Sequence, residues 1–233
     1  MKEEIVKLEA VNKIYKTGDT SITALDTTDI GFNSGELTLI MGPSGSGKTT
    51  LLSILGFVIY PTSGRVFYKG QEVTKLKENA LADLRLKEIG FVFQHFNLIE
   101  PLNALENVMQ PLILQGMDSG KASEKAMRAL EEVGLADRIK NLPKKLSGGQ
   151  KQRVSIARAL VTEPSMILCD EPTASLDAKS AEMIMNELKS LAESGKAVII
   201  VTHDLRLRKF ADRVIYVEEG VVSNTIKNED DYK

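Results

Sequence analysis

Short apolar runs alternate with longer segments of helical spacing along most of this chain. This alternation predicts an α/β protein with a mostly parallel sheet. The segment Thr49–Leu55 is predicted to be a helix that leaves a glycine-rich turn. Four runs are apolar enough to be central strands buried on both faces of the sheet: Leu37–Met41, Ile89–Phe93, Met166–Cys169 and Ala197–Thr202.

The strand pattern is absent from the middle of the chain, between Gln94 and Val161. Within this stretch, Ala122–Val133 and Gln150–Val161 place their apolar residues at helical spacing. We therefore expect a helical lobe inserted into the sheet domain.

The two ends of the chain carry shorter strand signals. Arg213–Val217 and Val221–Asn224 lie on either side of an acidic turn that ends in Gly220, and we expect them to form a terminal hairpin. The first ~75 residues are rich in Thr, Val and Ile, so they are expected to add a small antiparallel sheet. The charged tail Lys227–Lys233 is expected to fray.

Composition is that of an ordinary globular protein with one large domain or two small lobes. Of the 233 residues, 27% are charged and 42% are hydrophobic, and the net charge of −2 argues against a nucleic-acid binder with a broad basic surface. The single cysteine, Cys169, excludes an internal disulfide and is interpreted as a small buried hydrophobe.

Nothing in the sequence predicts a membrane span or a signal peptide. The N-terminus is acidic, and the longest apolar run, Leu51–Tyr60, is shorter than the ~18 residues that a transmembrane helix needs. We therefore expect a protein that is soluble by itself and that reaches a membrane only through a partner.

A complete phosphate-binding pattern, G-x-x-x-x-G-K-[ST], occupies Gly42–Thr49 between a predicted strand and a predicted helix. Glycines let backbone N–H groups turn toward phosphate oxygens, and the helix adds its positive N-terminal end. We expect Lys48 to reach the β- and γ-phosphates and the Thr49 hydroxyl to ligate Mg²⁺. A plain glycine turn with an incidental lysine is the alternative, and the context disfavours it.

Two acidic residues follow the buried strand that ends at Cys169. Ligands of open α/β sheets bind at the carboxyl ends of strands, so Asp170 is expected to hold Mg²⁺ directly or through water. Glu171 is placed to polarise the attacking water as a general base. The alternative is a solvated loop acid that caps the next helix.

A second glycine-rich element, Leu146–Gln150, lies between these two motifs in the sequence. A short Ser-Gly-Gly turn that opens a helix is itself a site for anions. One chain therefore carries two phosphate-binding surfaces, which suggests a pocket built from two copies of the protein.

This turn and the helix after it resemble the signature motif of ATP-binding-cassette (ABC) ATPases, and Glu171–Asp177 resembles their extended second Walker motif and D-loop. The order and spacing of the motifs match over nearly the whole chain. The resemblance implies a P-loop NTPase with a RecA-like, mostly parallel sheet core, an antiparallel β subdomain and an inserted α-helical subdomain. It implies one ABC ATPase domain over 1–233, with the catalytic core at 1–93 and 162–226 and the helical subdomain at 94–161.

The resemblance also implies roles for individual residues. Tyr15 is similar to the aromatic residue that stacks on adenine, Gln94 to the Q-loop glutamine at the metal and water, and His203 to the switch histidine at the γ-phosphate. The implied catalytic residues are Glu171, His203, Gln94 and Lys48, and the implied Mg²⁺ ligands are Thr49, Gln94 and Asp170. The implied ATP-binding residues are Tyr15, Gly42, Pro43, Ser44, Gly45, Ser46, Gly47, Lys48, Thr49, Thr50, Gln94, Ser147, Gly148, Gly149, Gln150, Asp177 and His203.

Each of these roles has a plainer alternative. Tyr15 could be a sheet aromatic, Gln94 a surface strand end, and His203 a helix-capping residue. The other histidine, His95, is interpreted as an ordinary loop residue.

In the family, two such subunits pack head to tail around two ATP molecules, so a homodimer is expected.

Three classes of function compete: a transporter ATPase, a DNA-repair or chromosome ATPase, and a translation factor. The second class usually carries a long coiled-coil or zinc insertion, and the third usually has two cassettes and a basic linker. The 94–147 stretch has no heptad run and no cysteine cluster, so the transporter class is favoured and no nucleic-acid partner is expected.

Within transporters, the stretch Ile89–Val108 resembles a bacterial branch that includes lipoprotein-releasing, macrolide-exporting, antimicrobial-peptide-resistance and haem-exporting ATPases. The branch implies separate integral-membrane permease subunits that dock near Phe96–Val108, and a place at the cytoplasmic face of the bacterial cell membrane. The alternative for this segment is that its apolar residues are core residues of the helical lobe.

Overall fold

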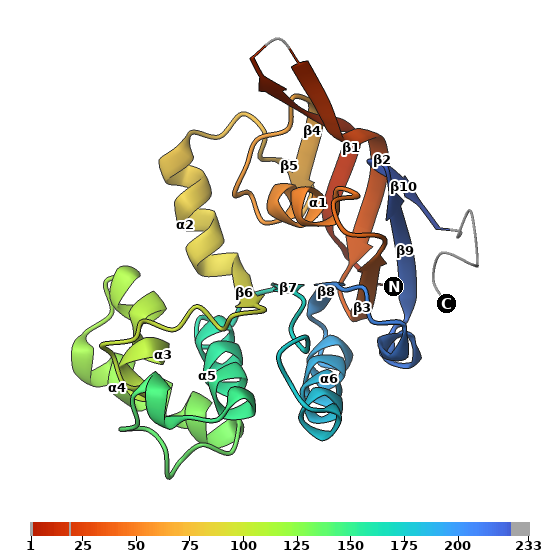
Figure 1. The fold of residues 1–233 in the computed structure, drawn as a ribbon. Helices are drawn as coiled ribbons and strands as arrows, with labels where there is room; N and C mark the ends of the chain where they lie inside the picture. Colours follow the sequence, from red (N-terminus) through yellow and green to blue (C-terminus); the bar gives the residue numbers. More distant parts are fainter. Residues whose placement is uncertain (1, 19, 225–233) are drawn as a thin grey trace.

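The computed structural model describes residues 2–18 and 20–224. The expected frayed tail Lys227–Lys233 and the last two residues of the predicted catalytic core, 225 and 226, lie outside this part of the chain. The described residues form two sheets with helices packed around them (Figure 1). None of the described helices is long and apolar enough to cross a membrane.

The larger sheet has six strands in the order β10-β9-β3-β8-β7-β6, all parallel except for the antiparallel hairpin β9-β10. The four central strands are those predicted from the apolar runs, with small shifts at their ends. The strand bounds are β3 (Glu36–Met41), β6 (Ile89–Phe93), β7 (Met166–Asp170), β8 (Ala197–Val201), β9 (Arg213–Glu218) and β10 (Val221–Ser223).

The smaller sheet is antiparallel, in the order β2-β1-β4-β5, as the N-terminal composition predicts. Two long strands, β1 (Glu4–Thr17) and β2 (Thr20–Asn33), form most of it, and β4 (Ser63–Tyr68) and β5 (Gln71–Glu72) complete it. The predicted fold class, α/β with an antiparallel subdomain and inserted helices, is confirmed.

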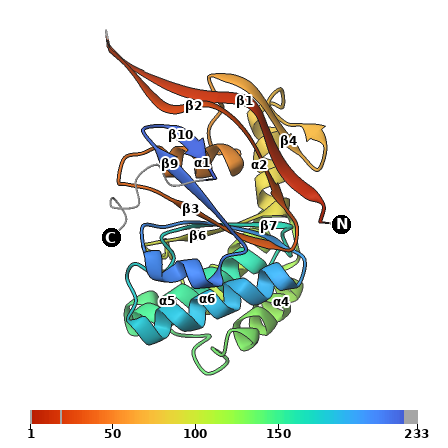
Figure 2. The same ribbon diagram turned by 90° about the vertical axis from the view of Figure 1, so that its right-hand side faces the viewer.

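The parallel sheet is buried on both faces, because alternate residues of each strand enter different cores. In β8, for example, Ile199 packs with the antiparallel sheet and α1 (Lys48–Leu55), whereas Ile200 packs with α6 (Ala178–Glu193) and α5 (Gly148–Leu160). Figure 2 shows α1 on one side of the sheet and α5 and α6 on the other. The sheet therefore separates α1 from the helix that begins at the signature turn.

The middle of the chain folds as helices, as predicted: α3 (Ala104–Leu114), α4 (Ser119–Glu132) and α5 enclose their own apolar core. The last two begin earlier than predicted, because Asp118 caps α4 and Ser147 caps α5 with side-chain acceptors. Helix α5 lies directly on β6, where a Cβ on Gly90 would be 2.5 Å from the Ala159 carbonyl oxygen.

Three helices were not singled out by the sequence pattern: α2 (Glu78–Glu88), α3 and α6, although α3 lies within the stretch that was expected to be helical. Helix α2 buries only Leu81, so its spacing carries little amphipathic signal. Helix α6 does carry one, since Ile184, Leu188 and Ala192 are buried at helical spacing. Two short 3-10 helices, Pro143–Lys145 and Leu205–Phe210, complete the described elements.

Candidate nucleotide site

Four parallel strands end at the same level of the sheet, and this brings the predicted motifs together. The paired residues Ile40, Val201, Asp170 and Phe93 form one row across β3, β8, β7 and β6. The phosphate loop, Thr202 and His203, Glu171, and Gln94 follow this row directly on their four strands. Carboxyl ends of parallel strands are where ligands bind in such sheets.

The loop after β3 has no room for side chains at two of its glycines. A Cβ on Gly42 would lie 2.0 Å from the Val217 carbonyl oxygen, and one on Gly47 would lie 2.2 Å from the Ala24 carbonyl oxygen. Both glycines have positive φ, 153° and 109°, which L side chains rarely adopt. The backbone of the loop is therefore held close to its neighbours, as a phosphate cradle requires.

Ser46 lies inside this loop with a buried hydroxyl that has no hydrogen-bond partner among the described residues. A buried polar atom without a partner costs free energy, so this hydroxyl is available to donate a hydrogen bond to a phosphate oxygen. The orphan hydroxyl and the two crowded glycines fit a bound phosphate chain.

Lys48 begins α1 with its side chain folded under the loop, and the residue is only 8% exposed. Its Nζ donates a hydrogen bond of 2.5 Å to the Pro43 carbonyl oxygen rather than to a carboxylate. Burial lowers the pKa of Lys48, and the nearby Glu171 and Asp170 partly offset this. The ammonium group is thus held at the loop without a strong counter-charge, as a phosphate ligand would need.

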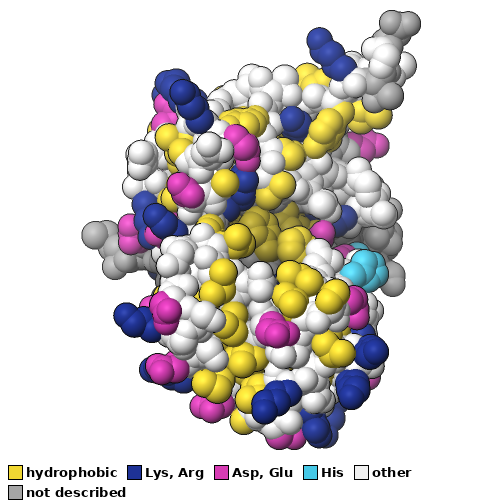
Figure 3. Space-filling model, turned by 90° about the vertical axis from the view of Figure 1, so that its left-hand side faces the viewer, with side chains coloured by type: hydrophobic (Ala, Val, Ile, Leu, Met, Phe, Trp, Pro, Cys, Tyr) yellow, Lys and Arg dark blue, Asp and Glu magenta, His cyan; other side chains and the backbone are white. Residues whose placement is uncertain are grey.

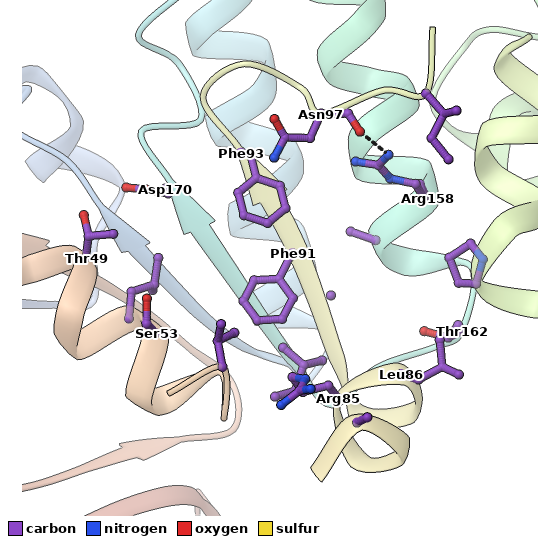
Figure 4. Close-up of a pocket in the computed structure, with 18 residues that line it drawn as sticks. Thr49, Ser53, Arg85, Leu86, Phe91, Phe93, Asn97, Arg158, Thr162 and Asp170 are labelled. Atoms are coloured by element: carbon purple, nitrogen blue, oxygen red, sulfur yellow. Dashed lines mark hydrogen bonds between the residues drawn. The ribbon is translucent and has the colours of Figure 1, made fainter. Parts of the chain in front are cut away.

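Asp170 ends β7 beside this lysine. Burial raises the pKa of its carboxyl group, with a further upward contribution from Glu171 and a downward one from Lys48. Thr49 and Asp170 face the same cavity from α1 and β7, as Figure 4 shows. Hydroxyl and carboxylate oxygens are ligands that Mg²⁺ accepts, so this pair fits the predicted cation.

The Glu171 carboxylate is held by three donors from the end of β8. Thr202 Oγ1 donates to Oε2 at 3.1 Å, while the His203 backbone N–H and Nδ1 lie 3.1 Å and 2.6 Å from Oε1. Glu171 itself has a left-handed φ of 48°, stabilised by a 2.9 Å bond from its N–H to the Val201 carbonyl oxygen. The predicted base and the predicted switch histidine are therefore in direct contact.

Gln94 follows β6, and its carbonyl oxygen accepts a 3.4 Å bond from Ser175 Oγ of the segment before α6. The next residues turn sharply: Phe96 and Asn97 both have positive φ, 62° and 46°. Arg158 of α5 donates to both of their carbonyl oxygens. The Q-loop is thus attached to the helical lobe by hydrogen bonds.

The signature turn lies on the other face of the sheet from α1. Ser147 and Gln150 form a capping box, in which Gln150 N–H donates to Ser147 Oγ at 3.3 Å and Ser147 N–H donates to Gln150 Oε1 at 2.9 Å. Gly148 faces the segment before α6, since a Cβ there would be 3.5 Å from Ser175 O, and Gly149 faces the first turn of α6, where a Cβ would be 3.3 Å from Ser180 Oγ.

Three other residues that are predicted to contact the nucleotide lie away from the centre of the phosphate loop. Tyr15 lies in the long hairpin of β1 with 41% of its surface exposed and Lys13 Nζ 5.0 Å from its ring centroid. Asp177 caps α6 by accepting from the Ser180 N–H and hydroxyl. Thr50 is half-buried in the first turn of α1.

The sequence did not single out Thr202 or Arg158, although both organise predicted site residues. Thr202 is fully buried beside Glu171, and Arg158 contacts the Q-loop. Only the three-dimensional pairing reveals their partners, because those partners are distant in the sequence.

The fold and this site define a P-loop nucleotide-binding protein of the α/β class. A family profile described as "ABC transporter" matches residues 25–174. An uncharacterised ABC transporter ATP-binding protein, YknY of Bacillus subtilis (strain 168), is 44% identical over 93% of this chain and 94% of its own length. The chain belongs to the ABC transporter family and is an ATP-hydrolysing cassette of it.

Two further relatives extend the comparison. The solved ATP-binding cassette MJ0796, described as a dimeric post-hydrolysis state bound to ADP and Pi, is similar with a TM-score of 0.86 and 44% identity, covering 94% of this chain and 98% of that one. The macrolide export ATP-binding/permease protein MacB of Vibrio parahaemolyticus is 40% identical over 97% of this chain, which spans only 35% of MacB. The expected family and ATPase activity are confirmed.

Replacement of Ser46 by Ala should have opposite effects on stability and on binding. Removing an unpaired buried hydroxyl should raise the free energy of unfolding of the nucleotide-free protein by up to about 1 kcal/mol, whereas ATP affinity should fall about tenfold. Chemical denaturation and calorimetric titration measure the two quantities. Ser53→Ala, further along α1, is the control and should leave affinity unchanged. Equal ATP affinity of Ser46→Ala and the parent protein would contradict the assigned phosphate contact.

Proposed function

We propose that this chain is the ATPase subunit of a bacterial efflux or mechanotransmission transporter. Two copies close around two ATP molecules and drive a conformational change in separate membrane subunits, whose cargo class is a peptide, an antibiotic, haem or a lipoprotein. The observation that carries the proposal is the position of the two anion-binding elements. Helix α1, which follows the phosphate loop, and the signature helix α5 pack on opposite faces of one sheet.

This separation favours a site shared by two chains. Ser147–Gly149 open α5, whose apolar residues pack against the far face of the sheet, whereas Lys48 and α1 pack on the near face. A second copy turned head to tail would bring its signature turn to the first copy's phosphate loop. The solved MJ0796 cassette is dimeric, which supports this arrangement.

Within each proposed site, the residues of the chain have different roles. The loop and Lys48 hold the phosphates, and Glu171 orients and deprotonates the attacking water, with Thr202 fixing its carboxylate. Thr49, Gln94 and Asp170 would hold Mg²⁺, which supplies charge neutralisation at the phosphates. His203 faces Glu171 through Nδ1, so its other ring nitrogen, Nε2, is the one that would contact the γ-phosphate.

The proposed docking site for the membrane subunit is an apolar groove beside the Q-loop. A cavity of about 670 Å³ lies between α1, α2, β6 and α3, as an open hollow on one face of the molecule (Figure 3). Its lining includes Leu52, Val58, Leu86, Phe91, Phe93 and Ile99. An amphipathic helix from a permease fits such a groove.

The predicted docking segment Phe96–Val108 divides into two parts. Ile99 is 44% exposed and lines the groove, while Ala104 and Val108 are buried in the helical core. The buried side chain of Asn107 holds the exposed part against the helical core. Its Oδ1 accepts from Ile99 N–H, and its Nδ2 donates to the Ile99 and Leu102 carbonyl oxygens. We propose that the exposed part, which includes Ile99, contacts the permease, and that the helical lobe 94–161 moves with it.

Export is favoured by the relatives. MacB is named as a macrolide exporter that joins the cassette to a permease, and this chain matches its cassette portion. We propose that the membrane partner of this chain is a separate subunit and that the complex lies at the cytoplasmic face of the cell membrane. No nucleic-acid partner is proposed.

Glu171→Gln tests the hydrolytic part of the proposal. The neutral amide keeps its place beside Thr202 but cannot take a proton from water, so turnover should fall by ~10²–10⁴. ATP and Mg²⁺ should then hold the variant as a dimer, which size-exclusion chromatography with light scattering detects. Normal turnover would exclude Glu171 as the base, and a persistently monomeric variant would contradict the ATP-bridged dimer.

Ile99→Asp tests the docking surface. A charge in the apolar groove should weaken binding of the chain to salt-washed membranes that contain its transporter by at least about tenfold, while ATP-dependent dimerisation is retained. Leu114→Asp is the matched control, because Leu114 is 72% exposed on the same lobe but does not line the groove. Unchanged membrane binding of Ile99→Asp, measured by co-sedimentation, would contradict the assignment.

A further inference from the structure

One guanidinium group joins the Q-loop to the signature helix. Arg158 Nη2 donates to the Phe96 carbonyl oxygen at 2.9 Å, and Nη1 donates to the Asn97 carbonyl oxygen at 2.6 Å. Figure 4 shows the second bond and the position of Arg158 on α5. The two acceptors are consecutive carbonyls, so the planar fork of the arginine holds a whole turn rather than a single atom.

The backbone of that turn depends on the arginine. Phe96 and Asn97 both have left-handed φ values, a conformation that non-glycine residues rarely adopt. Short local bonds, from Phe96 N–H to Phe93 O and from Asn97 N–H to His95 O, fold the turn back on itself. The surrounding contacts must stabilise this shape, and Arg158 supplies bonds to both left-handed residues from another element.

Few other groups could replace these two carbonyls as partners of the Arg158 guanidinium. Burial lowers its pKa, and no carboxylate contributes to the shift. A desolvated guanidinium that loses its carbonyl acceptors would be left with unpaired N–H groups, which is unfavourable. The bonds between α5 and the Q-loop should therefore persist when either element moves.

The other end of the same helix carries the signature turn. Ser147 caps α5, and the helix between Ser147 and Arg158 is fixed by buried Val154, Ile156 and Ala157, which face two different cores. A displacement of the Q-loop at Arg158 is thus transmitted through a packed helix to Ser147. Gln94 lies two residues before Phe96, so it is part of the same connection.

We propose that Arg158 is a positioning residue that makes the Q-loop and the signature helix move as one body. Gln94, beside the nucleotide held by its own copy, then sets the position of Ser147–Gly149 beside the nucleotide held by the other copy. This inference rests on the shared site proposed above. It assigns to Arg158 an effect on closure of the dimer and none on nucleotide binding by the single chain.

The test compares Arg158→Met, Arg158→Lys and Arg153→Met in the Glu171→Gln background of the 233-residue chain. Arg153 lies on the same helix and also donates to a backbone carbonyl, that of Val133, but it is outside the Q-loop. Two quantities are measured: the affinity of the single chain for ADP, by calorimetric titration, and the ATP concentration at half-maximal dimerisation, by light scattering.

Arg158→Met should raise the ATP concentration for half-maximal dimerisation by about tenfold while leaving ADP affinity within about twofold of the parent's. Arg158→Lys, which keeps the charge and can reach one carbonyl, should show a smaller increase, and Arg153→Met should show none. The lysine variant decides the matter if the methionine variant does not fold.

Unchanged dimerisation of the Arg158 variants would overturn the inference. So would a parallel loss of ADP affinity, or an equal loss in Arg153→Met, because either result would indicate a merely structural role. Failure of the Glu171→Gln parent to dimerise would instead refute the shared site itself, so the two failures are distinguishable.

Discussion

The common level at which β3, β8, β7 and β6 end is the constraint on which the site depends. Parallel strands whose residues alternate between two cores cannot slip by one residue without exposing a whole apolar set, so their register is strongly fixed. The row through Asp170 and Val201 therefore places the phosphate loop, the predicted general base and the predicted switch histidine at one edge. Motifs that are far apart in the sequence become neighbours through this register.

The sheet brings one half of the proposed site together at its carboxyl edge and holds the other half, the signature turn, away from that edge. Lys48 and Glu171 lie at its carboxyl edge with α1, but the signature turn opens a helix on the opposite face. An isolated chain thus carries the predicted phosphate loop, base and cation ligands without the second anion-binding surface. In the proposed dimer, completion by a second copy makes closure depend on ATP, so that ATP binding moves the attached helical lobe.

Much of this was predictable from the sequence, for physical reasons. The central strands are continuously apolar because both faces are buried, and the phosphate loop has fixed residue types because backbone must approach phosphate. Helix α2 was not predictable, because Leu81 is its only buried residue. The pairing of Arg158 with Phe96 and Asn97 was not predictable either, since the acceptors are backbone carbonyls and leave no pattern in residue type.

The central claim is that each ATP lies between the phosphate loop of one copy and the signature turn of the other. The most direct test measures ATP turnover of Lys48→Ala protein, of Ser147→Arg protein and of their equimolar mixture. Each variant alone should be inactive, and the mixture should regain up to about a quarter of the parent's activity, because half of its dimers carry one intact composite site. Full activity of either variant alone, or a mixture no more active than its components, would contradict the shared site.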